Sequence, residues 1–102
     1  MARFLVMYKT PADPAAFDKH YAEKHIPLAK KIPGIRKFEI SKGAVGTPGG
    51  PSPYHRVAIV EFDSLAALQA AIISPQGQAT AADAMAIATG GVDIYLFESG
   101  EA

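Results

Sequence analysis

His25 is the residue of this sequence best suited to proton transfer near neutral pH. Phe17, Tyr21, His25 and Leu28 are separated by four, four and three residues, which places them on one stripe of a helix. Burial on such a stripe disfavours the imidazolium form, whereas the C-terminal end of a helix favours it. The balance predicts titration near neutrality, which suits a general acid or base. The alternative is a core histidine that only bonds a backbone carbonyl.

Four further polar residues are candidates for a site around His25. Tyr21 lies one turn earlier on the same stripe, so its hydroxyl could bind or protonate a substrate oxygen, although many such tyrosines are simply core. Tyr54 and Arg56 alternate along a predicted strand and could line the mouth of a pocket. For Arg56 we favour a solvent-exposed strand end instead. Asp83 interrupts an alanine-rich helix and could orient an imidazole, although capping a loop is its more usual role.

Several kinds of site are excluded by residue type and spacing. The chain has no cysteine, which removes disulfides, thiolate catalysis and cysteine-based metal sites. His20 and His25 are five residues apart, about 140° around an α-helix, so they do not form a helical metal-binding pair. His55 is expected to project into solvent. No glycine-rich nucleotide motif is present, and the sequence predicts neither a metal nor a cofactor.

The charge balance argues against nucleic acid and membrane partners. Ten Lys and Arg residues balance ten Asp and Glu residues, so no broad field attracts phosphate backbones or anionic lipids. The apolar run at residues 3–8 is too short to span a bilayer. We therefore expect a cytoplasmic protein that binds a small molecule.

The elements that would position these residues form one domain, residues 1–102, in the order βαββαβ. Asp13-Pro14, Ser64 and Ser74-Pro75 are typical helix starts, and Pro27 predicts that the first helix stops or bends near His25. Residues 43–53 are rich in Gly and Pro and predict a mobile, irregular loop. The predicted strands are 3–9, 35–42, 54–62 and 92–98, and the predicted helices begin after Asp13, Ser64 and Ser74.

The strands are apolar on both faces, although this α+β arrangement covers only one of them. A βαββαβ chain with right-handed crossovers is ferredoxin-like, with both helical segments on one side of a four-stranded antiparallel sheet. Leaving several hundred Å² of apolar surface in water would forgo on the order of 10 kcal/mol. We therefore expect a homodimer joined through the bare face. The alternative is that the loop at 43–53 folds over it. The two-sided pattern is clearest at Val92, Ile94 and Leu96 against Tyr95 and Phe97.

Three stretches of the chain resemble the EthD-like family, named for ethyl tert-butyl ether degradation. They are Phe17-Asp-Lys-His-Tyr21 with His25-Ile-Pro-Leu28, then Pro33-Gly34-Ile35, then Ser74 to Ala79 with Asp83 and Gly90-Gly91. The resemblance implies a dimeric α+β barrel with a pocket between sheet and helices. Related barrels include isomerases, cyclases, cofactor-independent monooxygenases and haem-handling enzymes, so the family does not fix the reaction.

Three functions are compatible with these features. The first is a cofactor-independent isomerase, cyclase or monooxygenase acting on a small apolar carbonyl or ring compound. There His25 would transfer a proton, while Tyr21 or Tyr54 holds an oxygen. The second is a non-catalytic metabolite-binding or accessory protein of an oxidative degradation pathway. The third is a haem-binding protein with His25 as axial ligand.

Overall fold

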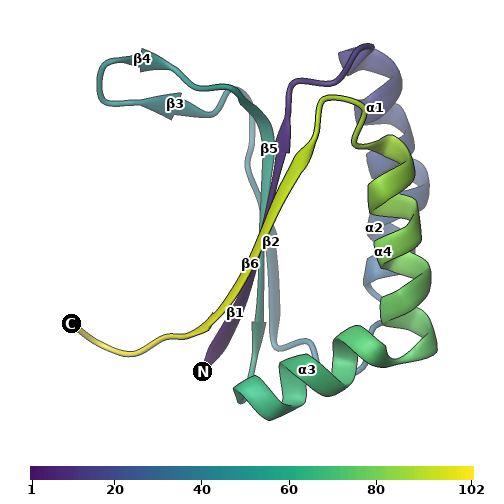
Figure 1. Cartoon of the computed structure of the whole chain (residues 1–102), viewed down its shortest axis with the longest axis vertical. Helices are drawn as coiled ribbons and strands as arrows, with labels where there is room; N and C mark the ends of the chain where they lie inside the picture. Colours follow the sequence, from purple (N-terminus) through teal and green to yellow (C-terminus); the bar gives the residue numbers. More distant parts are fainter.

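A computed structural model describes all 102 residues of the chain and shows one sheet with helices on one side (Figure 1). None of its helices is both long and apolar enough to cross a membrane. Along the chain the elements are β1 (Ala2–Lys9), α1 (Pro14–His20), the π-helical turn η1 (Tyr21–His25), α2 (Ile26–Ala29), β2 (Lys37–Ile40), β3 (Gly46–Thr47), β4 (Gly50–Pro51), β5 (Tyr54–Phe62), α3 (Leu65–Ile73), α4 (Pro75–Ile87) and β6 (Val92–Glu98).

The main sheet has four strands in the order β2-β5-β1-β6, and every neighbouring pair is antiparallel. All the helices cover the same face (Figure 1). This arrangement confirms the predicted ferredoxin-like α+β fold. The two central strands, β1 and β5, carry Val6, Tyr8, Ala58 and Val60 into the core beneath the helices.

The predicted helix starts are confirmed at atomic level. The side chains of Asp13, Ser64 and Ser74 each accept a hydrogen bond from the backbone N–H three residues later, at 3.0 to 3.1 Å. These bonds satisfy N–H groups that a helix leaves without partners. The caps thus fix where α1, α3 and α4 begin, and with them the positions of the site residues on α4.

The predicted irregularity of the first helix near His25 is present, but the helix does not stop there. It widens into the π-helical turn η1 and then continues through Pro27 as α2. Pro27 has no N–H, so the regular α-helical bond is missing there, and the N–H of Ile26 instead bonds the carbonyl of Tyr21. The wider turn changes the phase of the buried stripe: Ala29 is buried, whereas Leu28, the predicted position, is only half-buried.

Residues 43–53 are also more regular than predicted. They contain the short hairpin β3–β4, in which Gly46 pairs with Pro51 and Thr47 with Gly50. The hairpin projects on the side of the sheet away from the helices (Figure 1). It stands at one end of the bare face and does not cover it, which excludes the alternative that this segment buries that face.

The corner between α3 and α4 requires a glycine. A Cβ on Gly77 would lie 2.1 Å from the carbonyl oxygen of Ala71, closer than any real contact allows. This close approach lets α4 turn away from α3 and run along the helical layer beside α2 (Figure 1). The turn brings Thr80 and Asp83 of α4 opposite η1.

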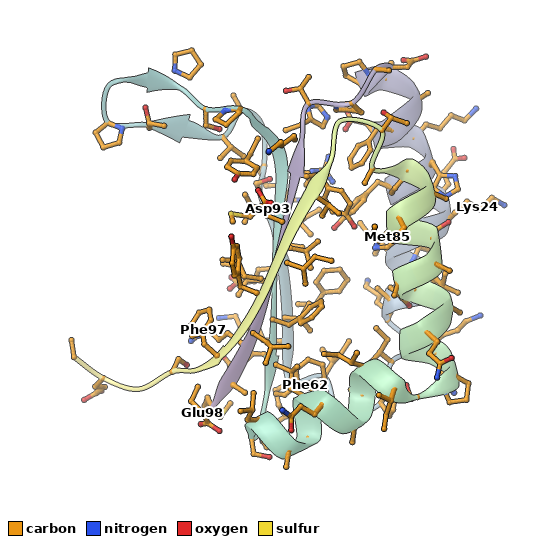
Figure 2. The ribbon with its side chains drawn as sticks, in the orientation of Figure 1. Lys24, Phe62, Met85, Asp93, Phe97 and Glu98 are labelled. Atoms are coloured by element: carbon orange, nitrogen blue, oxygen red, sulfur yellow. The ribbon has the colours of Figure 1, made fainter.

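The outer face of the sheet is apolar, as the alternation predicted. Tyr95 is 55% exposed and Phe97 44% exposed, and both lie on the side away from the helices, next to Leu5 and Arg3 of β1. Figure 2 shows Phe97 and Asp93 on this side, opposite Met85 on α4. The apolar residues of this face are Leu5, Met7, Val57, Ile59, Tyr95 and Phe97. We call this set the outer apolar face.

Candidate active site

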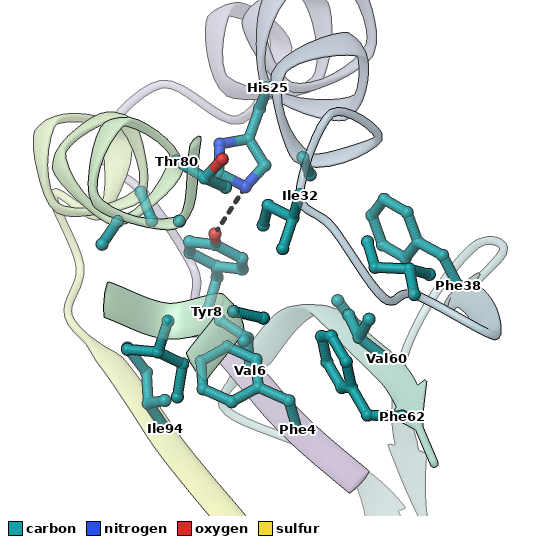
Figure 3. Close-up of a pocket in the computed structure, with 18 of the residues that line it drawn as sticks. Phe4, Val6, Tyr8, His25, Ile32, Phe38, Val60, Phe62, Thr80 and Ile94 are labelled. Atoms are coloured by element: carbon teal, nitrogen blue, oxygen red, sulfur yellow. Dashed lines mark hydrogen bonds between the residues drawn. The ribbon is translucent and has the colours of Figure 1, made fainter. Parts of the chain in front are cut away.

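A cavity of about 100 Å³ lies between the sheet and the helices, and His25 is part of its wall (Figure 3). Sixteen of the nineteen residues that line it are hydrophobic. The polar groups in the wall are few: the imidazole of His25, the hydroxyl of Thr80 and the phenols of Tyr8 and Tyr21. A mostly apolar cavity with a few converging polar groups is the usual form of a small-molecule site.

His25 and Tyr8 face each other across this cavity. The Tyr8 hydroxyl lies 3.4 Å from Nε2 of His25, a long hydrogen bond that is drawn in Figure 3. The ring of Tyr21 stacks on the imidazole, with centroids 5.0 Å apart, and holds it from one side. Nε2 of His25 and the hydroxyl of Tyr8 therefore lie together in the wall of the cavity.

The other nitrogen of His25 is bound to Asp83, which orients the imidazole. Nδ1 lies 2.8 Å from Oδ2 of Asp83, so it donates its hydrogen to the ionised carboxylate. This contact assigns the proton of the neutral ring to Nδ1 and leaves the lone pair of Nε2 facing Tyr8 and the cavity. Asp83 thus orients an imidazole, the less favoured of its two predicted roles, and caps no loop.

Asp83 also binds His20, which corrects the prediction about the two histidines. Nε2 of His20 lies 2.8 Å from Oδ1 of Asp83, so both imidazoles meet on one carboxylate. Five residues separate them by about 140° in an α-helix, but the wide turn η1 carries the chain round by nearly one turn between them. The two imidazoles therefore meet on one carboxylate, which the angle of a regular α-helix did not predict.

The environment sets the charge of each group. Burial lowers the pKa of His25 below 6.5, although its hydrogen bond to Asp83 and the charge of that group act in the opposite direction. Burial acts to raise the pKa of Asp83, but the hydrogen bonds from His20 and His25 lower it overall. Burial also raises the pKa of Tyr8 well above its usual value. At neutral pH the site therefore holds a neutral imidazole, a carboxylate and a neutral phenol.

The predicted pairing of Tyr54 with Arg56 on one face is wrong. The register of β1 against β5 shifts here, so that Tyr8 pairs with Arg56 but Lys9 pairs with Tyr54. The bulge turns Tyr54 to the outer face, where its hydroxyl donates to Asp93 at 2.6 Å. Neither Tyr54 nor Arg56 lines the cavity.

Arg56 and His55 remain on the helix side and bind the surface of α1. The guanidinium of Arg56 lies 4.6 Å from the ring centre of Tyr21, and both Arg56 and His55 contact one oxygen of Asp18. The prediction that His55 projects into solvent is therefore incomplete, because its imidazole binds Asp18. Tyr21 is fully buried, and burial raises its pKa to about 12. This cluster packs behind Tyr21 and supports the cavity wall from outside.

The sequence reading missed Tyr8 and His20 as site residues. Alternation placed Tyr8 on the same strand face as Phe4 and Val6, so it was treated as core. The sequence feature that could have identified Tyr8 is its phenol hydroxyl, the one polar group in the otherwise apolar row formed with Phe4 and Val6. For His20, the angle to His25 was that of a regular α-helix, and the π-helical turn between the two residues changes this angle.

The lowered pKa of His25 predicts a pH-dependent stability. The folded protein favours the neutral imidazole, so the unfolded chain takes up the proton at higher pH. Stability from this group is therefore complete above pH 6.5, the ordinary value, and is lost as the pH falls towards the folded pKa. We expect the melting temperature to fall between about pH 7.5 and about pH 5 and the fall to be smaller in His25→Gln. Equal slopes for the two proteins would contradict this assignment.

The fold and the site together define a ferredoxin-like α+β domain with a histidine–carboxylate pair beside an apolar cavity. Residues 9–90 match the family model described as the EthD domain. The chain belongs to this family. It is 42% identical over 96 residues to an uncharacterized 11.0 kDa protein from the thcB–thcC intergenic region of Rhodococcus erythropolis, covering 94% of this chain and 92% of that one.

Solved structures agree with this assignment. An EthD family protein from Bacillus halodurans has a TM-score of 0.90 and 33% identity, over 98% of this chain and 99% of that chain. SnoaB, a cofactor-independent oxygenase from Streptomyces nogalater, shares the fold with a TM-score of 0.69 and 17% identity, over 99% and 94%. A dimeric protein of unknown function from Bacteroides fragilis has a TM-score of 0.67 and 20% identity, over 96% and 95%.

Proposed function

We propose that this protein is a cofactor-independent enzyme that removes a proton from a small apolar carbonyl or ring compound, with Nε2 of His25 as the base. One observation carries the proposal: Asp83 holds the proton of His25 on Nδ1, so Nε2 is a proton acceptor in the wall of an apolar cavity, where it has only a long contact to the Tyr8 hydroxyl. Asp83 fixes the orientation of the ring and stabilises the imidazolium that forms when Nε2 takes up a proton.

Tyr8 supplies the second group that such a reaction needs. Its neutral hydroxyl lies 3.4 Å from Nε2, and on substrate binding it can turn from Nε2 to donate its hydrogen bond to a carbonyl oxygen. The lone pair of Nε2 is then available for the neighbouring C–H proton. Return of that proton from Nε2 to another carbon gives isomerisation. Attack of the resulting enolate carbon on a second carbonyl carbon forms a C–C bond, and the new alkoxide takes the proton from Nε2, which gives cyclisation. With dioxygen as the oxidant, the enolate carbon forms a C–O bond, the electron pair passes to oxygen, and the peroxide takes the proton from Nε2 as a hydroperoxide. The likeness in fold to a cofactor-independent oxygenase supports including the last of these.

The cavity limits the size of the substrate. At about 100 Å³ it is smaller than the engineered cavity of roughly 150 Å³ that accepts benzene. A short ketone is therefore the class that fits with little rearrangement, whereas a six-membered ring requires the cavity wall to move or part of the ring to stay in the mouth of the cavity. A haem would require both His25 and Tyr8 to move apart, and it is not favoured by this geometry.

The mouth of the cavity offers a direct test. Ala81 on α4 and Ile94 on β6 both line the cavity and are both exposed, so the opening lies between them. We expect Ala81→Phe to block entry and to reduce turnover of a panel of small ring ketones and phenols at least about tenfold. The matched control is Ala82→Phe, because Ala82 is exposed on the same helix but does not line the cavity.

The outcomes of this test separate catalysis from binding. Oxygen uptake and product formation are measured alongside binding of the same compounds. Loss of turnover in Ala81→Phe with normal turnover in Ala82→Phe supports the proposal. Binding to the wild-type chain with no turnover of any compound would instead support the second candidate, a metabolite-binding or accessory protein.

We also propose that the chain forms a homodimer through the outer apolar face. Leu5 of β1 pairs with Ile59 on one side and Tyr95 on the other, so an apolar row crosses the sheet. The hairpin β3–β4 and the C-terminal segment both extend on this side of the sheet and flank the face (Figure 1). A stable interface buries roughly 800 Å² per partner, a modest part of the 6130 Å² surface of this chain.

A second copy is the occupant that fits this face best. The chain carries equal numbers of acidic and basic residues, so two copies do not repel each other. Charged side chains are placed at the margins: Arg3 and Glu61 form a salt bridge beside the apolar row, and Asp93 is bound by Tyr54. An apolar centre with a polar rim is the usual form of a protein interface. The likeness to a dimeric protein of the same fold supports the proposal.

A further inference from the structure

His20 connects the buried site to the surface of the molecule. Its side chain is 38% exposed and lines a shallow hollow formed with Asp13 before α1 and Thr89 after α4. Its Nε2 binds Oδ1 of Asp83, whose Oδ2 binds the buried His25. An unbroken series of imidazole, carboxylate and imidazole therefore runs from the solvent to the cavity.

Both oxygens of Asp83 are used by these two contacts, each at 2.8 Å. If His20 were absent, the carboxylate could rotate about its side-chain bond and turn either oxygen towards water. Bound on both sides, it has one orientation, and that orientation determines which nitrogen of His25 carries the proton. The bond from His20 therefore acts on the base through Asp83.

We propose that His20 is a positioning residue for His25. Its contact holds Asp83 in place, and the charge on its partly exposed imidazole affects how readily the buried imidazole of His25 accepts a proton. The inference rests on the proposed function for its catalytic meaning. A cationic His20 satisfies part of the negative charge of Asp83 and repels a second cation at His25. The charge of His20 at the surface thus affects the proton affinity of the buried His25.

Few other charges compete for this role. Asp13 faces His20 from the segment before α1, and Asp83 faces it from α4. Helix α1 also carries Lys19 and Asp18, the latter bound to His55 and Arg56, and the following turn η1 carries Glu23 and Lys24. On the cavity side, the titratable neighbours of His25 are Tyr8 and Tyr21, with the cation Arg56 behind the second of these.

The test is a titration of the histidine side chains by ¹⁵N NMR, on the full chain without any ligand. In His20→Gln the amide can still donate to Asp83, but the charge is gone. We expect the midpoint of His25 to rise by about 0.5 pH unit, with its proton on Nδ1 as before.

The control is Lys24→Gln, which removes a cation from the same helix without a contact to Asp83. An unchanged His25 midpoint in His20→Gln, or equal shifts in both variants, would overturn the proposal. With a substrate in hand, His20→Ala should lower kcat about tenfold and His20→Gln should restore it. If His25→Gln leaves turnover unchanged, the proposed function fails, whereas the NMR result still decides whether His20 is coupled to His25.

Discussion

Replacing His25 with glutamine should lower kcat by about 10²- to 10⁴-fold, the usual contribution of a positioned general base. Glutamine is similar in size and can still donate to Asp83, so the wall of the cavity is preserved. It has no group that accepts a proton at neutral pH, however. Binding of the compound, measured without turnover, should change little, because the other lining residues are untouched.

The matched control for this experiment is Thr80→Val. Thr80 is buried in the same cavity wall, but its hydroxyl already donates to the backbone carbonyl of Gln76. Its replacement should therefore leave kcat within a few-fold of the wild-type value. A His25→Gln enzyme that turns over as fast as the Thr80→Val enzyme would remove His25 from the mechanism.

The double change Tyr95→Glu and Phe97→Glu should convert the protein to a monomer at micromolar concentrations. Both side chains are largely exposed in the single chain, so the monomer loses little of its own packing. In a face-to-face dimer the two carboxylates would be buried without partners, at a cost of several kcal/mol or ~10³-fold in Kd. Sedimentation equilibrium measures the change directly.

The control for the dimer prediction is Met85→Glu. Met85 is 63% exposed on α4, on the opposite side of the molecule from the outer apolar face (Figure 2). The substitution introduces the same charge away from the proposed interface, so the protein should still sediment with the mass of a dimer. A wild-type chain that sediments as a stable monomer would contradict the dimer proposal outright.

The elements were predictable because their signals are local. Asp13, Ser64 and Ser74 mark helix starts by side chains that bond N–H groups three residues away, and nothing distant alters that chemistry. The alternation in β6 likewise depends only on the pleat of the strand. The ferredoxin-like order of the sheet then follows from short connections and right-handed crossovers.

The site was only partly predictable because it depends on two irregularities of the backbone. The wide turn before Pro27 brings His20 round to Asp83, and the bulge at the start of β5 sends Tyr54 to the outer face. Each changes the register by a single residue, which composition and periodicity do not reveal. His25 and Tyr21 were predictable because they are four residues apart, and both side chains remain buried on one side of the helical segment even in the wide turn η1.

The carboxylate of Asp83 belongs to α4, whereas both imidazoles that it binds belong to the first helical segment. The contacts that prepare the base are therefore the same contacts that hold these two helices together. If α4 moved outward to admit a substrate, the contacts of Asp83 with both imidazoles would break, and His25 would lose the hydrogen bond that orients it. In the proposed mechanism a substrate would therefore enter while α4 stays in contact with the first helical segment, through the opening beside Ala81 and Ile94, and Nε2 of His25 would remain shielded from bulk water.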